Sequence, residues 1–299
     1  MRKEMKLAKI VVPLVLIGLV GCKSTQPEAT KNIVNVPLAV PLQANFRNEI
    51  AIARFNELLL QPDMANEQRA QLLYNRGMLY DSIGLQTLAR IDFNRAVQIK
   101  PDLAEVYNFL GIHQTLEQNY GRAYEMFDAV LELDEQHEYA YLNRGIALYY
   151  GERADLAVKD FEAFLARAPK DAYRAMWLYI AQQQVDDVLA KQTLAANSQA
   201  LDPDEWSSQL VALYLGTLSE EAFLAQISEG VSTQEEYAQR LCEAYFYLAK
   251  RYQTQGDLAS AISYFKLALA TNVYEFVEHK YARLELDLLA QLNDEQDAS

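Results

Sequence analysis

A period of 34 residues constrains the fold of this chain more than any other feature of its sequence. From Ala70 onward, each unit has a small residue at its eighth and twentieth positions and a phenylalanine at its twenty-fourth. A fixed period of this length predicts units of two antiparallel helices, in which small side chains let the helices approach and bulky ones fill the space between units. The residues predicted to make this packing are Gly77, Tyr80, Ala89, Phe93, Gly111, Ala123, Phe127, Gly145, Ala157, Phe161, Ala249, Ala261 and Phe265.

The same offsets match the tetratricopeptide repeat, and this resemblance implies an all-α helical solenoid. Three repeats occupy residues 70–171, and a fourth clear repeat occupies residues 242–275. Residues 172–241 keep helical spacing but lack the small residues at the packing offsets, so irregular or degenerate helical repeats are predicted there.

Further helices are predicted at both ends of the repeats. Residues 43–69 form an extra N-terminal helical segment, whose helix from Gln43 to Leu60 carries Ile52, Phe55 and Leu59 on one stripe. Residues 276–291 predict a final helix that covers the open end of the stack as a cap. Residues 292–299 are polar and are predicted to be a disordered tail.

The N-terminus has the pattern of a secretory signal peptide. Four cations precede an apolar run from Ile10 to Val20, and Pro13 interrupts that run. A membrane-spanning helix needs about 20 apolar residues, so this run is too short to span a bilayer. Residues 1–21 are therefore predicted to be a signal peptide.

Cys22 follows this apolar run directly. The sequence Leu19-Val20-Gly21-Cys22 resembles the lipobox of bacterial lipoproteins, and the resemblance implies a palmitoylated, lipid-modified Cys22 at the mature N-terminus. An ordinary signal peptide with a chance cysteine is the alternative. The next position holds Lys23, and the resemblance to lipoproteins that lack an aspartate there implies sorting to the outer membrane, facing the periplasm. Residues 22–42 hold three prolines and predict a flexible tether.

The composition excludes several kinds of function. Asp and Glu number 41 against 27 Lys and Arg, so a nucleic-acid-binding surface has no electrostatic basis. The same acidity repels anionic lipid and limits membrane contact to the lipid anchor. Three histidines and two cysteines provide too few ligands for a zinc cluster. No cofactor or metal is expected besides the lipid on Cys22, and Cys242 is predicted to be a buried thiol.

Catalytic motifs are missing from the sequence. It contains no GxSxG, HExxH, P-loop or GxGxxG segment, and the histidines are far apart. His113 and His279 are predicted to be packed or surface residues of helices, because a general base needs a positioned partner. We therefore expect a protein that is not an enzyme.

The first helices of the repeats are expected to line a concave groove that is mixed and partly apolar. Such a groove suits a partner helix or an apolar segment. Alternatively, these side chains pack on another segment of the same chain or on a second copy. The candidate partner-binding residues are Tyr74, Met78, Asp81, Glu105, Asn108, Ile112, Tyr139, Leu142, Ile146, Tyr149 and Tyr150.

The lipobox, the repeat order and the strings LLYNRGMLYDS, VLELD, YLNRGIALYYG and FVEHKYARLEL resemble the tetratricopeptide-repeat lipoproteins of the bacterial outer membrane. The resemblance implies a homodimeric adaptor that binds a periplasmic tail-specific protease, delivers a murein endopeptidase to it and organises other cell-wall hydrolases at the peptidoglycan. An assembly or pilotin-like tetratricopeptide lipoprotein of an outer-membrane or pilus machine is the alternative.

Overall fold

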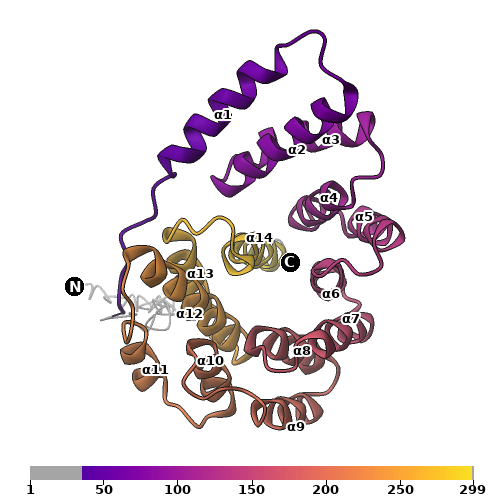
Figure 1. Cartoon of the computed structure of the whole chain (residues 1–299). Helices are drawn as coiled ribbons and strands as arrows, with labels where there is room; N and C mark the ends of the chain where they lie inside the picture. Colours follow the sequence, from indigo (N-terminus) through magenta and orange to yellow (C-terminus); the bar gives the residue numbers. More distant parts are fainter. Residues whose placement is uncertain (1–35, 298–299) are drawn as a thin grey trace, which may run out of the picture. The chain divides into compact units, whose positions relative to one another are not determined.

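Helices make up all the regular secondary structure of residues 36–297, the part of the chain that the computed structural model describes (Figure 1). The predicted all-α fold class is confirmed. The helices are α1 Phe46–Leu59, α2 Asn66–Ser82, α3 Gln86–Ile99, α4 Ala104–Leu116, α5 Tyr120–Leu133, α6 Ala140–Tyr150, α7 Ala154–Arg167, α8 Ala172–Val185, α9 Asp187–Ser198, α10 Trp206–Leu215, α11 Glu220–Gln226, α12 Gln234–Thr254, α13 Leu258–Ala270 and α14 Val277–Asp297.

Three successive helix pairs, α2 with α3, α4 with α5 and α6 with α7, are held at close range by a glycine and a phenylalanine. A Cβ atom on Gly77 would lie 2.6 Å from Phe93 Cε1, and the Gly111 and Gly145 positions meet Phe127 and Phe161 in the same way. The absence of a side chain at these glycines therefore sets the distance between the paired helices. The packing residues predicted from the period are buried, apart from Tyr80, which is half-buried.

An arginine and an aspartate sixteen residues apart add a second repeated contact. Arg76 donates two hydrogen bonds to Asp92, at 2.6 and 2.7 Å, and Arg144 donates two to Asp160, both at 2.8 Å. Each aspartate is buried and accepts two hydrogen bonds, from Nε and Nη2 of one guanidinium, which is a strong geometry for such a pair. Arg76 and Arg144 occupy a repeat position that is usually apolar, and the aspartate partner explains why arginine is accommodated there.

The region predicted to be irregular contains α8 to α11 and the beginning of α12. It includes α10 with 10 residues and α11 with 7, both shorter than the repeat helices around them. By contrast, α8 is buried over most of its length, and Trp177 contacts both Phe161 and Phe246. This region therefore supplies part of the largest hydrophobic core.

The last helix does not cap the open end of the stack, and that prediction is wrong. α14 lies on the inner side of the curved repeat array, with the other helices around it (Figure 1). The Tyr281 ring stacks on Tyr150 at 5.4 Å and meets Trp177 edge-on at 6.2 Å. Because Tyr281, Ala282 and Leu284 are all buried, α14 needs neighbours on more than one side, which an end cap cannot provide.

The predicted disorder from Leu292 onward is also not observed as far as Asp297. α14 continues through this segment, although the side chains from Ala290 to Glu295 are exposed. The segment contains no glycine or proline that would end a helix, so the helix extends beyond its packed part.

The segment before α1 is attached to the helical body. The Leu42 amide donates to the Thr271 carbonyl at 2.9 Å, the Asn272 side chain donates to the Leu42 carbonyl at 3.2 Å, and the Tyr245 hydroxyl donates to the Pro37 carbonyl. A tether extending to residue 42 therefore does not describe residues 36–42, because Val36, Ala39 and Leu42 pack on the core. Asn45 caps α1 by accepting from the Arg47 amide.

Candidate functional site

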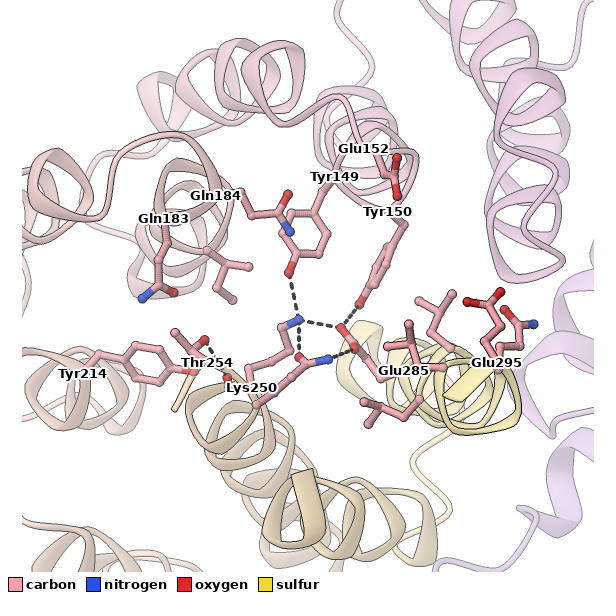
Figure 2. Close-up of a pocket in the computed structure, with 16 residues that line it drawn as sticks. Tyr149, Tyr150, Glu152, Gln183, Gln184, Tyr214, Lys250, Thr254, Glu285 and Glu295 are labelled. Carbon is pink, nitrogen blue, oxygen red and sulfur yellow. Dashed lines mark hydrogen bonds and ion pairs between the residues drawn. The ribbon is translucent and has the colours of Figure 1, made fainter. Parts of the chain in front are cut away.

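A cavity of about 510 Å³ opens on the inner side of the helical array, between α6, α8, α10, α12 and α14 (Figure 2). One wall is the C-terminal half of α14, which contributes Leu288, Leu289 and Leu292. The opposite wall includes Ile180 of α8 and Tyr214 of α10. A concave site that is largely apolar with a few polar groups is the usual form of a ligand or peptide pocket.

The floor of this cavity is a buried polar network centred on an ion pair. Lys250 of α12 donates to Glu285 Oε1 of α14 at 2.6 Å, to Tyr149 Oη at 2.8 Å and to Gln253 Oε1 at 2.9 Å. The Tyr150 hydroxyl donates to the same carboxylate at 2.8 Å, and the Gln253 amide donates to its second oxygen at 2.8 Å. The network joins α6, α12 and α14 (Figure 2).

The electrostatics of the floor keep these groups in fixed protonation states. Burial alone would lower the pKa of Lys250, but the Glu285 carboxylate and the Tyr149 hydroxyl raise it above its ordinary value. Burial and the Glu285 charge raise the pKa of Tyr150 well above its ordinary value. Lys250 thus stays charged and Tyr150 stays a neutral donor. Each of these floor groups already has a partner, so the floor acts as a rigid surface.

The rim of the cavity carries side-chain amides from two helices. Gln183 and Gln184 lie on α8, and Gln291 lies on α14. A side-chain amide both donates and accepts, as a peptide group does, and Leu292 at 52% exposure adds apolar surface beside them. The rim therefore has the chemistry to bind an extended peptide that carries an apolar side chain.

A second buried network holds the first half of α14. Asp81 of α2 accepts from Lys280 at 3.1 Å, and its other oxygen lies 2.8 Å from Nε2 of His113 in α4. Burial alone would raise the pKa of Asp81, but the hydrogen bond from His113 and the charge of Lys280 lower it below its ordinary value. Lys280 also donates to the Tyr274 carbonyl at 2.6 Å. α14 is thus fixed to the repeats at two separate places.

The predicted groove residues do not form one open surface. Asp81 and Tyr150 bind α14 through the two networks, and Tyr149 receives the Lys250 ammonium. For these residues, the alternative of packing on the same chain is the one that the structure shows. In the whole set, Asp81, Asn108, Leu142, Ile146 and Tyr149 are buried, Tyr74, Met78, Ile112 and Tyr150 are half-buried, and Glu105 and Tyr139 are exposed.

Only Tyr149 and Tyr150 of the predicted groove residues reach the cavity. Sequence reasoning missed the contributions of α8, α12 and α14. One sequence signal could have indicated this site: Lys250 ends the mostly apolar segment CEAYFYLAK. A lysine in a buried helix needs a carboxylate partner, so the segment predicts a buried ion pair.

The remaining single residues have packing roles. Cys242 is buried, as predicted, and burial raises the pKa of its thiol well above the ordinary value. The His279 ring lies 3.2 Å from the Leu269 carbonyl, and the His137 ring lies 3.3 Å from Glu105. Cys22, with the predicted signal peptide and the first part of the tether, lies outside the described residues.

Residues 36–297 hold neither a candidate membrane-spanning helix nor a candidate metal site. None of the helices described there has both the length and the apolar character needed to cross a bilayer. In the same residues, histidine, cysteine and carboxylate side chains do not gather in groups of three that could hold a metal ion.

A sequence model of the tetratricopeptide repeat matches residues 70–103, which correspond to most of α2, all of α3 and the turn before α4. Similar solved structures include a tetratricopeptide repeat protein from Parabacteroides merdae (18% identity over 75% of this chain and 78% of that one, TM-score 0.48). PilF of Pseudomonas aeruginosa is also similar, with 18% identity over 74% of this chain and 99% of that one and a TM-score of 0.43. YrrB, described as a TPR protein with an unusual peptide-binding site, has 13% identity over 76% of this chain and 95% of that one and a TM-score of 0.43. The match at residues 70–103 and the repetition of its glycine–phenylalanine contact in the next two helix pairs identify a tetratricopeptide-repeat fold in this chain.

Proposed function

We propose that this chain is a scaffold for protein–protein interactions, and that a peptide segment of a partner docks in the cavity beside α14. The observation that carries the proposal is the cavity itself, with its rigid ion-paired floor and its rim of amide and leucine side chains. A preformed site lowers the entropic cost of binding, because its side chains are already ordered.

A finer proposal rests on the sequence. The lipobox at Cys22 and the strings shared with tetratricopeptide-repeat lipoproteins support a relative of the outer-membrane lipoprotein NlpI, anchored by lipid and facing the periplasm. In this role the chain is a non-catalytic adaptor that binds a tail-specific protease and presents a murein endopeptidase for degradation. Holding both on one scaffold raises their effective concentration to about the millimolar range.

We also propose that the chain is a homodimer formed through α1. None of the 14 residues of α1 is buried, and Phe46 and Ile50 are 70% and 53% exposed. A helix with so much exposed apolar surface is stabilised by packing on a partner. Light scattering that gives the mass of one chain at micromolar concentration would contradict the dimer.

The docking site is tested by two matched substitutions and purified partners. Leu292→Lys places a charge on the rim. Val188→Lys also replaces an exposed apolar side chain by lysine, but at a 66% exposed residue of α9 that does not line the cavity. We expect Leu292→Lys to weaken binding of the tail-specific protease or the murein endopeptidase by at least about tenfold, and Val188→Lys to leave it unchanged. Equal binding by both variants would exclude the cavity as the docking site.

The anchor is tested separately. A Cys22→Ser variant should lose the lipid and leave the membrane fraction. If that variant were matured and retained as before, the lipoprotein proposal would be wrong, whereas the docking proposal would stand.

A further inference from the structure

Two carboxylate side chains, Glu243 of α12 and Glu278 in the first turn of α14, are buried where these helices meet. They are only 8% and 6% exposed, and neither forms an ion pair within residues 36–297. Their hydrogen-bond donors are neutral. The Trp206 indole donates to Glu243 Oε2 at 2.7 Å, and the Tyr247 hydroxyl donates to Glu278 Oε1 at 3.3 Å.

Two cations on the same helices, Arg240 and Lys280, have other partners. On α12, Arg240 acts on Glu243 at a distance, but its guanidinium donates to Glu236 at 3.0 Å and to the Glu229 carbonyl at 2.7 Å. On α14, Lys280 is engaged by Asp81. Neither cation therefore forms an ion pair with Glu243 or Glu278.

The other titratable neighbours are neutral. Burial raises the pKa of Tyr173 in α8 and of Tyr247 and Cys242 in α12 above their ordinary values. Burial lowers the pKa of His279, which follows Glu278 on α14, to about 4. Among the surrounding charged groups, only the distant Arg240 guanidinium favours ionisation of Glu243, and it does not outweigh burial. Two ionised carboxylates at this place would therefore repel each other.

We propose that Glu243 and Glu278 form a pH-sensitive latch, which strengthens the packing of the first turns of α14 on α12 while the pair retains a proton and weakens it when both carboxylates are ionised. The latch lies at the end of α14 opposite the cavity. Its operation does not depend on which partner the cavity binds.

The sign of the pH effect follows from the two protonation states. Burial raises the pKa of Glu243 to about 7, and burial together with the Glu243 charge raises that of Glu278 to about 8. Once α14 opens, both carboxyl groups meet water and lose their protons above about pH 4.5. The stability of the state in which α14 is packed on α12 is therefore greatest below that pH. It falls as the pH rises and reaches its minimum above about pH 8.

Hydrogen exchange of the full chain between pH 5.5 and 8.5 measures this opening. After correction for the intrinsic exchange rate, the protection of amides in residues 277–284 should fall about tenfold per pH unit for each proton held by the pair. Glu278→Gln and Glu243→Gln should each lower this slope by the contribution of one proton. The double variant should show no dependence of protection on pH. α3, which is distant from the pair, should keep its protection. A wild-type slope of zero, or a slope unchanged in both single variants, would overturn the latch.

A spectroscopic readout reports on Glu243 directly. Trp177→Phe leaves Trp206 as the sole tryptophan, and the Trp206 indole donates to Glu243, so its emission responds to the ionisation of that carboxyl. We expect an emission shift centred between about pH 6 and 9, which disappears when Glu243→Gln is added. Emission that is flat in this range, or that titrates identically with glutamine at position 243, would show that Glu243 does not titrate there and would overturn its role in the latch.

Discussion

Removing one partner of the Lys250–Glu285 pair should be among the most damaging single changes in this protein. Glu285→Leu leaves the Lys250 ammonium buried, with only the Tyr149 hydroxyl and the Gln253 carbonyl oxygen as acceptors, and it deprives the Tyr150 hydroxyl of its acceptor. An uncompensated charge in such a site costs about 3–5 kcal/mol of unfolding free energy.

Lys250→Met has the complementary defect. It leaves the Glu285 carboxylate buried, with the Tyr150 hydroxyl and the Gln253 amide as its remaining donors, so we expect a similar loss of about 3–5 kcal/mol. The double variant removes both charges at once and fills the space with apolar side chains. It should therefore cost no more than either single change, which corresponds to a coupling energy of about 3 kcal/mol or more.

Urea unfolding near neutral pH, followed by the helical circular dichroism signal, measures these free energies. Equal m-values in all four proteins would show that the comparison concerns stability alone. The reasoning would be refuted if the two single losses added to within about 0.5 kcal/mol in the double variant, because independent sites behave in that way.

Three further predictions concern the repeats and use the same unfolding measurement. Gly111→Val places a side chain against the Phe127 ring and should cost about 1–3 kcal/mol through overpacking; an unchanged stability would mean that the helix pair can separate freely. Gly121→Ala is the matched control, since nothing lies within 4 Å of its new Cβ, and it should gain up to about 1 kcal/mol of helix stability. Arg144→Lys cannot reproduce the two parallel bonds to Asp160 and should lose about 1.5–3 kcal/mol; a loss below about 0.5 kcal/mol would make that pair irrelevant to stability.

The repeat units could be predicted because their packing is local. Gly77 and Phe93 belong to one helix pair and lie sixteen residues apart, so the sequence period alone places them in contact. The Arg144–Asp160 pair has the same separation and was present in the sequence as a departure from the usual apolar residue. Regular spacing thus predicts the glycine–phenylalanine contact, whereas the aspartate partner of the arginine was not predicted.

The position of α14 could not be predicted in this way. Its apolar stripe indicated that the helix is packed, but its partners are distant in sequence: Tyr150 lies 135 residues before Glu285, and Lys250 lies 35 residues before it. The curvature of the repeat array decides whether a final helix covers the end or lies inside. That curvature depends on many small angles between successive helix pairs, and no single residue encodes it.

Photo-crosslinking of the purified partners to a benzoylphenylalanine placed at one position of the scaffold tests the docking site directly. Gln184 lies on the rim of the cavity, and Gln199 is exposed at the end of α9, away from the cavity lining. We expect a covalent adduct with the protease or the endopeptidase from position 184 and none from position 199, mapped to one segment of the partner by mass spectrometry. Adducts formed equally from both positions, or from position 199 alone, would contradict a partner docked beside α14.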